Sequence, residues 1–217
     1  GAMRTLAAMD GLPPTSRPYI GFSDNTAVHL ALLRARVVSF HGPHAGGELS
    51  PFAESVLRRV LFTPEPAGTL SLPADAPVPM ALVSGSAEGE LVGGNLSLLA
   101  SLIGTPWPLD ARGRILFIEE VGESFYRLDR MLMQLRLAGS LDGVAGVVLG
   151  QFTQCASDDC ERSLDALLRD LLAPLGVPVG YGYPFGHVAD NWTLPVGVRA
   201  HFDADAGTLT LLEPAVA

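Results

Sequence analysis

The hydrophobic and polar positions of the first sixty residues follow two patterns in turn. Residues 18–22 and 36–40 are short apolar runs, which are typical of buried strands. Residues 24–36 and 51–62 space their apolar side chains at helical intervals, and each segment follows one of the runs. Because strands that alternate with helices form parallel sheets, this part of the chain predicts an α/β fold.

The same alternation returns after a proline-rich interval. Five prolines lie between residues 63 and 79, which predicts a linker or an extended crossing there. The tail, residues 191–212, predicts two alternating strands joined by a hairpin turn at 203–207. The patterns between these segments predict a helix over 96–102, a strand over 114–118, a helix over 124–138, a strand over 143–150 and a helix over 159–172.

Composition narrows the classes of function. Of the 217 residues, 48% are hydrophobic, which is enough for a substantial core. The net charge of −9 disfavours nucleic acid and anionic membrane surfaces as partners. All 14 basic residues are arginines, so this chain offers no lysine for a Schiff base, a Walker phosphate loop or a Ser-Lys dyad.

Targeting and redox signals are sparse. No apolar run reaches the length of a membrane span, and the first residues show no basic region followed by an apolar core. The two cysteines, Cys155 and Cys160, are too few for a disulfide scaffold, which favours a reducing compartment. We therefore expect a cytoplasmic location.

The junction Gly21-Phe22-Ser23-Asp24 places a serine between a predicted strand and a predicted helix. A serine on such a turn presents its hydroxyl as a nucleophile, and the backbone N–H of Asp24 can donate to an oxyanion. A serine in front of a helix more often acts as an N-cap. The segment also differs from the hydrolase elbow Gly-x-Ser-x-Gly, because Asn25 occupies the last position.

Two further sites carry acid–base candidates. Glu119 stands at the carboxyl end of a predicted strand, where open α/β sheets place ligand-binding groups, and Glu120 points to the opposite side. His187, in a glycine-flanked loop, suits the role of a general base. Each has a structural alternative: solvated strand ends for the glutamates, and an exposed or hydrogen-bonded core side chain for the histidine.

The other histidines are weaker candidates. His41 and His44 form a His-x-x-His pair in a glycine-rich loop, but no third ligand is evident and the pair is not on a helix. We therefore expect no metal there. His29, on a predicted helix, and His201, on a predicted strand, are expected to have packing or surface roles.

Seven ordered blocks together resemble the L,D-carboxypeptidase family, the murein tetrapeptide carboxypeptidases, to which the microcin-C self-immunity peptidases are similar. The resemblance extends from residue 1 to about residue 212. The blocks are IGFSDNT (20–26), HGP (41–43), LVGGNL (91–96), ILFIEEVGE (115–123), YRLDRM (126–131), QLRLAG (134–139), and FGH (185–187) with TLPVG (193–197).

The resemblance implies a serine peptidase that uses a Ser-His-Glu triad and no cofactor or metal. It assigns Ser23 as nucleophile, His187 as base and Glu119 as the acidic member, with the Asp24 backbone N–H in the oxyanion hole. Because the family more often has Glu-Asp at this point, Glu120 is the lesser candidate. The implied reaction releases the terminal D-alanine of a cytoplasmic murein tetrapeptide for cell-wall recycling, and the implied assembly is a homodimer.

The resemblance also implies two domains. Residues 1–62 would form the C-terminal part of an N-terminal parallel-sheet domain that bears the nucleophile elbow. Residues 63–84 would be a linker, and residues 85–217 a smaller C-terminal α/β domain that carries Glu119 and His187. Family members have a longer segment before the elbow, so we expect the N-terminal domain to be incomplete here.

Two alternatives stay open. An immunity-type peptidase would cleave a peptidyl-aminoacyl nucleotide with the same triad. Those relatives carry an aromatic-bearing insertion for the base, and residues 63–90 contain no Trp, Tyr or His, which favours the murein substrate. The second alternative is a non-catalytic binding or assembly module, which an incomplete N-terminal domain would explain.

Overall fold

The structure, a computed structural model, describes residues 1–7, 17–44, 46–156 and 163–216. The α-helices are α1 (Ala2–Ala7), α2 (Thr26–Arg34), α3 (Pro51–Leu61), α4 (Leu96–Ser101), α5 (Phe125–Leu137) and α6 (Leu164–Leu172). The strands are β1 (Ile20–Gly21), β2 (Ser39–His41), β3 (Gly68–Thr69), β4 (Met80–Val83), β5 (Ser86–Asn95), β6 (Ile115–Val121), β7 (Gly146–Thr153), β8 (Val179–Tyr181), β9 (Leu194–Val196), β10 (Arg199–Asp203) and β11 (Thr208–Leu211). Two 3-10 turns, Ser23–Asn25 (η1) and Ala173–Leu175 (η2), complete the set.

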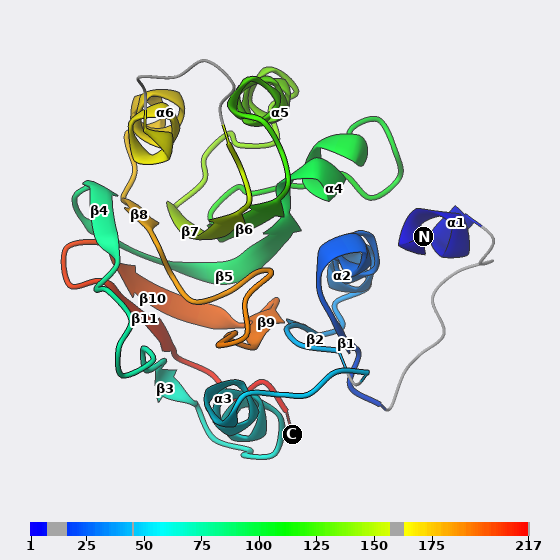
Figure 1. Ribbon diagram of the computed structural model, residues 1–217. Coiled ribbons are helices and arrows are strands. Elements are labelled where there is room, and N and C mark those ends of the chain that lie inside the picture. The colour runs from blue at the N-terminus through cyan, green and yellow to red at the C-terminus, as the bar shows by residue number, and fades with distance from the viewer. Residues whose placement is uncertain (8–16, 45, 157–162, 217) are drawn as a thin grey trace.

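An eight-stranded sheet of order β3-β11-β10-β5-β6-β7-β8-β4 forms the centre of the molecule (Figure 1). Its consecutive strands β5, β6, β7 and β8 are parallel, and antiparallel strands extend the sheet on both sides. A smaller sheet of order β1-β2-β9 contains one parallel and one antiparallel pair. This mixed architecture confirms the predicted α/β fold class.

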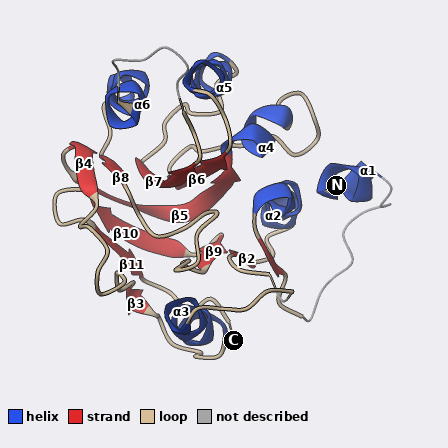
Figure 2. Ribbon diagram, in the orientation of Figure 1, coloured by secondary structure: helices blue, strands red, loops and turns tan. Residues whose placement is uncertain are grey.

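The two faces of the large sheet are covered differently. Figure 2 shows α4, α5 and α6 along one face, and α3 with the small sheet on the other. In β6, Leu116 and Ile118 pack with the three helices, whereas Ile115 and Phe117 pack with α3 and the small sheet. Since strand residues alternate between faces, the next two residues of β6, Glu119 and Glu120, also point to opposite faces of the sheet.

Most predicted elements are present, with shifted ends. The hairpin of β10 and β11 and the predicted helices are confirmed, except that residues 159–162 of the last predicted helix lie outside the described residues. The strand predicted over 36–40 begins only at Ser39. The reason is a left-handed Arg36 (φ 59°) that ends α2, with the Val37 N–H donating to the Leu32 carbonyl as in a Schellman motif.

Two stretches differ more from the sequence-based expectation. No strand is predicted over 86–95, but these residues form the ten-residue strand β5, with Gly93 and Gly94 near its end. A Cβ atom at Gly93 would lie 1.8 Å from the Phe117 carbonyl oxygen, so close strand packing explains the glycine there. The predicted linker, 63–84, contains β3 and β4, which form the opposite edges of the large sheet, so it is an extended crossing. The division into domains stays a prediction.

Two further features concern the predicted class of protein. Among the helices that the structure describes, none combines the length and the apolar character that a membrane-spanning helix requires. Cys155 is a free thiol, and Cys160 lies outside the described residues.

Candidate active site

The turn after β1 holds Ser23 in an unusual backbone conformation. Ser23 begins η1 with a φ of 57°, a left-handed geometry that a residue with a side chain adopts only at a cost in free energy. The N-cap positions of η1 and α2 belong to Phe22 and Asn25, so Ser23 does not cap either helix. The N–H of Asp24 lies in the first turn, where backbone donors lack partners within the helix.

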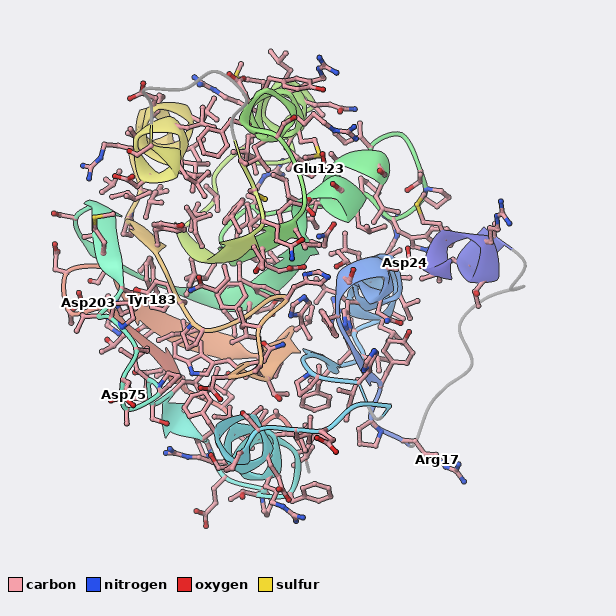
Figure 3. The ribbon with its side chains drawn as sticks, in the orientation of Figure 1. Arg17, Asp24, Asp75, Glu123, Tyr183 and Asp203 are labelled. Carbon is pink, nitrogen blue, oxygen red and sulfur yellow. The ribbon has the colours of Figure 1, made fainter. Side chains whose placement is uncertain are left out.

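Several hydrogen bonds hold this turn in place. The buried His29 lies between Gly21, whose carbonyl oxygen is 2.8 Å from Nε2, and Ser39, whose hydroxyl is 2.9 Å from Nδ1. Burial lowers the pKa of His29 to about 4, so its ring is neutral at pH 7. The Asp24 carboxylate accepts from the Ala2 N–H, and Figure 3 shows Asp24 beside α1.

The turn is also tied to the large sheet. The Asn95 backbone N–H, at the carboxyl end of β5, donates to the Thr26 hydroxyl at 2.9 Å. Asn95 pairs with Glu119 of β6 in the parallel register. The start of α2 therefore lies next to the strand ends where an open α/β sheet places its functional groups.

Glu119 and His187 form the central pair of the site. Glu119 Oε2 lies 2.7 Å from His187 Nδ1, and the Glu119 side chain is fully buried. The His187 side chain is 23% exposed. Its ring lies 5.0 Å from the ring of Phe22, the residue before Ser23, so the histidine stands between the carboxylate and the turn. With Nδ1 bonded to Glu119, Nε2 is the ring nitrogen free for a second partner.

The loop between β8 and β9 positions His187. Asn191 closes this loop with two hydrogen bonds to Gly186, one to its N–H and one to its carbonyl oxygen. Gly186 has a φ of 117°, and a Cβ atom there would lie 2.9 Å from the Glu119 Cβ. A glycine is therefore required where the loop passes the carboxylate.

The electrostatics of the pair favour a protonated histidine. The hydrogen bond to Glu119 raises the pKa of His187 above 6.5, with support from the charges of Glu119 and Glu120 and opposition from partial burial. Burial raises the pKa of the Glu119 carboxyl, and the hydrogen bond and charge of His187 counteract part of that effect.

Glu120 faces the helix-covered side of the sheet. One oxygen accepts from the Asn95 amide (2.8 Å) and the Val121 N–H (2.9 Å), and the other from the Ser97 N–H and hydroxyl (both 2.7 Å). It is 2% exposed, so the reading of both glutamates as solvated strand ends is wrong. Its hydrogen bonds stabilise the N-terminus of α4.

The His-x-x-His pair is split between interior and surface. His41 ends β2 and is fully buried, whereas His44 is exposed and its ring lies 5.5 Å from the ring of Phe22. Within the described residues, no three His, Cys, Asp or Glu side chains gather as metal ligands. The pair is therefore not arranged as a common metal site.

A cavity of about 610 Å³ lies beside the His187 loop. Its walls combine the loop with β7, α3 and the crossing between β3 and β4, and they include Phe52, Asp75, Gln151, Pro184, Val188 and Asp190. Figure 3 shows Asp75 on that crossing. The cavity falls in the size range of ligand pockets.

Comparison with known proteins shows the family to which the chain belongs. Residues 88–202, more than half of the chain, match the family model described as the LD-carboxypeptidase C-terminal domain. The chain belongs to the LD-carboxypeptidase family. It is 46% identical over 203 residues to a putative carboxypeptidase of Streptomyces coelicolor, covering 91% of this chain and 63% of that protein.

Two further members of the LD-carboxypeptidase family carry more specific names. The murein tetrapeptide carboxypeptidase of Pseudomonas aeruginosa is 36% identical over 190 residues, covering 85% of this chain and 62% of that protein. The crystal structure of muramoyltetrapeptide carboxypeptidase from Oxalobacter formigenes superposes with a TM-score of 0.74 at 38% identity, covering 90% of this chain and 67% of that one. The chain thus spans less than two thirds of the length of both curated relatives.

Within this LD-carboxypeptidase chain, the structure brings some of the predicted residues together. Glu119 and His187 are hydrogen-bonded, and Ser23 follows the residue that contacts the His187 ring. Glu120 points to the other face of the sheet, His44 is exposed in the loop after β2, and His201 lies on β10. Sequence reasoning missed the contact between His41 and Glu119, because it depends on the packing of β2 against the end of β6.

Proposed function

We propose that Ser23, His187 and Glu119 form the catalytic triad of a serine-type L,D-carboxypeptidase. The observation that supports this most is the 2.7 Å hydrogen bond between Glu119 and His187 beside the left-handed Ser23 turn. Because the chain spans less than two thirds of the length of its curated relatives, the activity of the whole protein is part of the proposal.

The residue types define a mechanism. His187 Nε2 takes the Ser23 hydroxyl proton while Oγ attacks the scissile carbonyl carbon, and the carbonyl oxygen becomes an oxyanion that accepts from the Asp24 N–H. Glu119 holds Nδ1 of His187 and stabilises the imidazolium that forms. The imidazolium then gives its proton to the leaving amine, which departs as D-alanine. A water molecule, deprotonated by His187, hydrolyses the acyl-serine ester.

The proposed substrate is a murein tetrapeptide, from which the enzyme releases the terminal D-alanine. The names of the Pseudomonas and Oxalobacter proteins support this class. The cavity beside the His187 loop, with Asp75 and Asp190 in its wall, suits a peptide that carries a free amine, such as one containing a diamino acid. We further propose a cytoplasmic homodimer that acts in cell-wall recycling.

Labelling of the nucleophile tests the proposal. A fluorophosphonate probe should modify the full-length protein at Ser23, and Ser23→Ala should abolish both the labelling and D-alanine release from murein tetrapeptide. Labelling that persists in Ser23→Ala would refute the assignment of Ser23 as the nucleophile. Turnover of a peptidyl-aminoacyl nucleotide in preference to the tetrapeptide would instead favour the immunity-type reaction with the same triad.

A further inference from the structure

The carboxylate of Glu119 faces two histidines, one at each oxygen. Oε2 is bonded to His187, and Oε1 lies 4.0 Å from Nε2 of His41. Both Glu119 and His41 have side chains that are 0% exposed. Neither Oε1 nor either ring nitrogen of His41 has a hydrogen-bond partner among the described residues. Since an unpaired buried polar atom is costly, these facing atoms are poised to interact.

The fold leaves His41 little freedom to turn away. It is the last residue of β2 and pairs with Leu194 of β9 in the small sheet. Its ring packs 5.3 Å from Phe117 and 6.4 Å from Phe22, on the same face of β6 as Glu119. The neighbouring rings therefore keep Nε2 directed at the carboxylate.

His41 is a neutral donor at this position. Burial lowers the pKa of His41 well below 6.5, and the nearby His29 and His187 lower it further. A neutral imidazole has one N–H and one lone pair. Because a carboxylate oxygen faces Nε2, the tautomer with its proton on Nε2 is favoured. Glu120, the other acidic neighbour of Glu119, points to the opposite face of the sheet and already has its donors.

On the basis of the proposed function, we propose that His41 is a positioning residue for Glu119. Its Nε2–H donates to Oε1 after a shift of about 1 Å brings the two atoms to hydrogen-bond distance. The carboxylate is then held at both oxygens, and Oε2 stays aimed at Nδ1 of His187. His41 affects catalysis through Glu119 and touches no substrate atom.

A matched pair of substitutions separates this role from simple packing. His41→Gln can place its terminal amide near the position of Nε2, whereas the shorter amide of His41→Asn cannot reach Oε1. We expect His41→Asn to lower kcat for D-alanine release by about 10- to 100-fold, as for other groups that orient a functional side chain, with KM changed less than about threefold. His41→Gln should recover kcat to within about threefold of the wild type.

The same pair is then tested without the carboxylate. In a Glu119→Gln background, His41→Asn should slow fluorophosphonate labelling of Ser23 by less than about twofold, because the residue through which it acts is already altered. His201→Phe, which removes a histidine from β10 away from the site, is the control and should leave kcat and KM unchanged. Thermal unfolding of each variant confirms that the folded protein is compared.

The outcomes separate this inference from the proposed function. Equal kcat losses for His41→Gln and His41→Asn would overturn the positioning role. So would a slowing of Ser23 labelling by more than about twofold when His41→Asn is added to Glu119→Gln. So would wild-type kcat in His41→Asn when Ser23→Ala and Glu119→Gln are inactive. Full activity of Ser23→Ala would refute the triad itself, whatever the His41 variants show.

Discussion

Glu119 and Glu120 are neighbours in one strand, nearly equally buried, yet their surroundings differ completely. Glu120 accepts four hydrogen bonds from groups that do not titrate near neutral pH. Within the part of the chain that the structure describes, Glu119 accepts one hydrogen bond, from a histidine whose other ring nitrogen is free for a reacting group. Burial therefore does not mark a functional carboxylate by itself. The nature of its partners distinguishes a carboxylate that stabilises the fold from one that supports chemistry.

The difference follows from strand geometry. Leu116 and Ile118 direct their side chains toward the helices, and Glu120 continues that series. Ile115 and Phe117 face the small sheet, and Glu119 continues theirs into the space between His41 and His187. The two carboxylates lie near the carboxyl end of β6, where the register with β7 shifts after Ile118. Adjacent positions thus reach two separate environments.

The largest effect on kcat should come from substituting Glu119 or its partner His187. Glu119→Gln and His187→Ala should each lower kcat by about 10³- to 10⁶-fold, with much smaller changes in tetrapeptide binding. Because a misaligned base is nearly as ineffective as an absent one, the double variant should lose little more than either single variant. Release of D-alanine by the full-length protein measures the cycle. A double loss equal to the product of the single losses would show that the two residues act independently.

Glu120→Gln should affect folding more than catalysis. The substitution removes a buried charge and turns an amide NH2 donor toward the Asn95 or Ser97 donors, which should lower the free energy of unfolding by about 2 to 4 kcal/mol. Urea unfolding measures the loss, with Glu119→Gln as the matched control in the same strand. The folded Glu120→Gln protein should keep kcat within about tenfold of the wild type. Loss of activity in Glu120→Gln together with retained activity in Glu119→Gln would show that Glu120, and not Glu119, is the carboxylate of the triad.

The pH dependence should separate the two glutamates more finely. Only neutral His187 can accept the Ser23 proton, so kcat/KM should rise with pH through an apparent pKa above 6.5, as the hydrogen bond to Glu119 requires. Glu119→Gln removes the partner that stabilises the imidazolium, so the residual kcat/KM should rise through an apparent pKa that is lower than in the wild type. Glu120→Gln should move the midpoint less. An unshifted midpoint in Glu119→Gln would contradict the role of this carboxylate.

Strand alternation in the sequence predicts that the two glutamates lie on opposite faces, but not which face carries the site. Both faces of a parallel sheet are covered, so the apolar residues of β6 look alike on either side. The resemblance to a family supplied the choice of Glu119, and the hydrogen bond to His187 supports it. The serine turn was similarly ambiguous between a nucleophile and an N-cap until Phe22 and Asn25 were found at the capping positions.

Non-local contacts were beyond the reach of the sequence patterns. His41 was considered only as a metal ligand, because its contact with Glu119 brings together strands that lie more than seventy residues apart along the chain. The strand β5 was missed because its small residues, Gly93 among them, fit close strand packing and not an apolar repeat. Local periodicity thus located most elements, whereas the environment of each site residue depended on how those elements pack.

The smallest effect is expected from removing metal ions, and it tests what lies between Glu119 and His41. Nε2 of His41 and Oε1 of Glu119 supply two possible ligand atoms, Oε2 is bonded to His187, and His44 is exposed in the loop after β2. Zinc sites need three or four ligands around one point, so these residues suit a hydrogen bond better than a metal. Dialysis against EDTA should therefore leave kcat for D-alanine release within about twofold of the untreated protein. Activity lost in EDTA and restored by zinc would show instead that His41 and Glu119 share a metal ion.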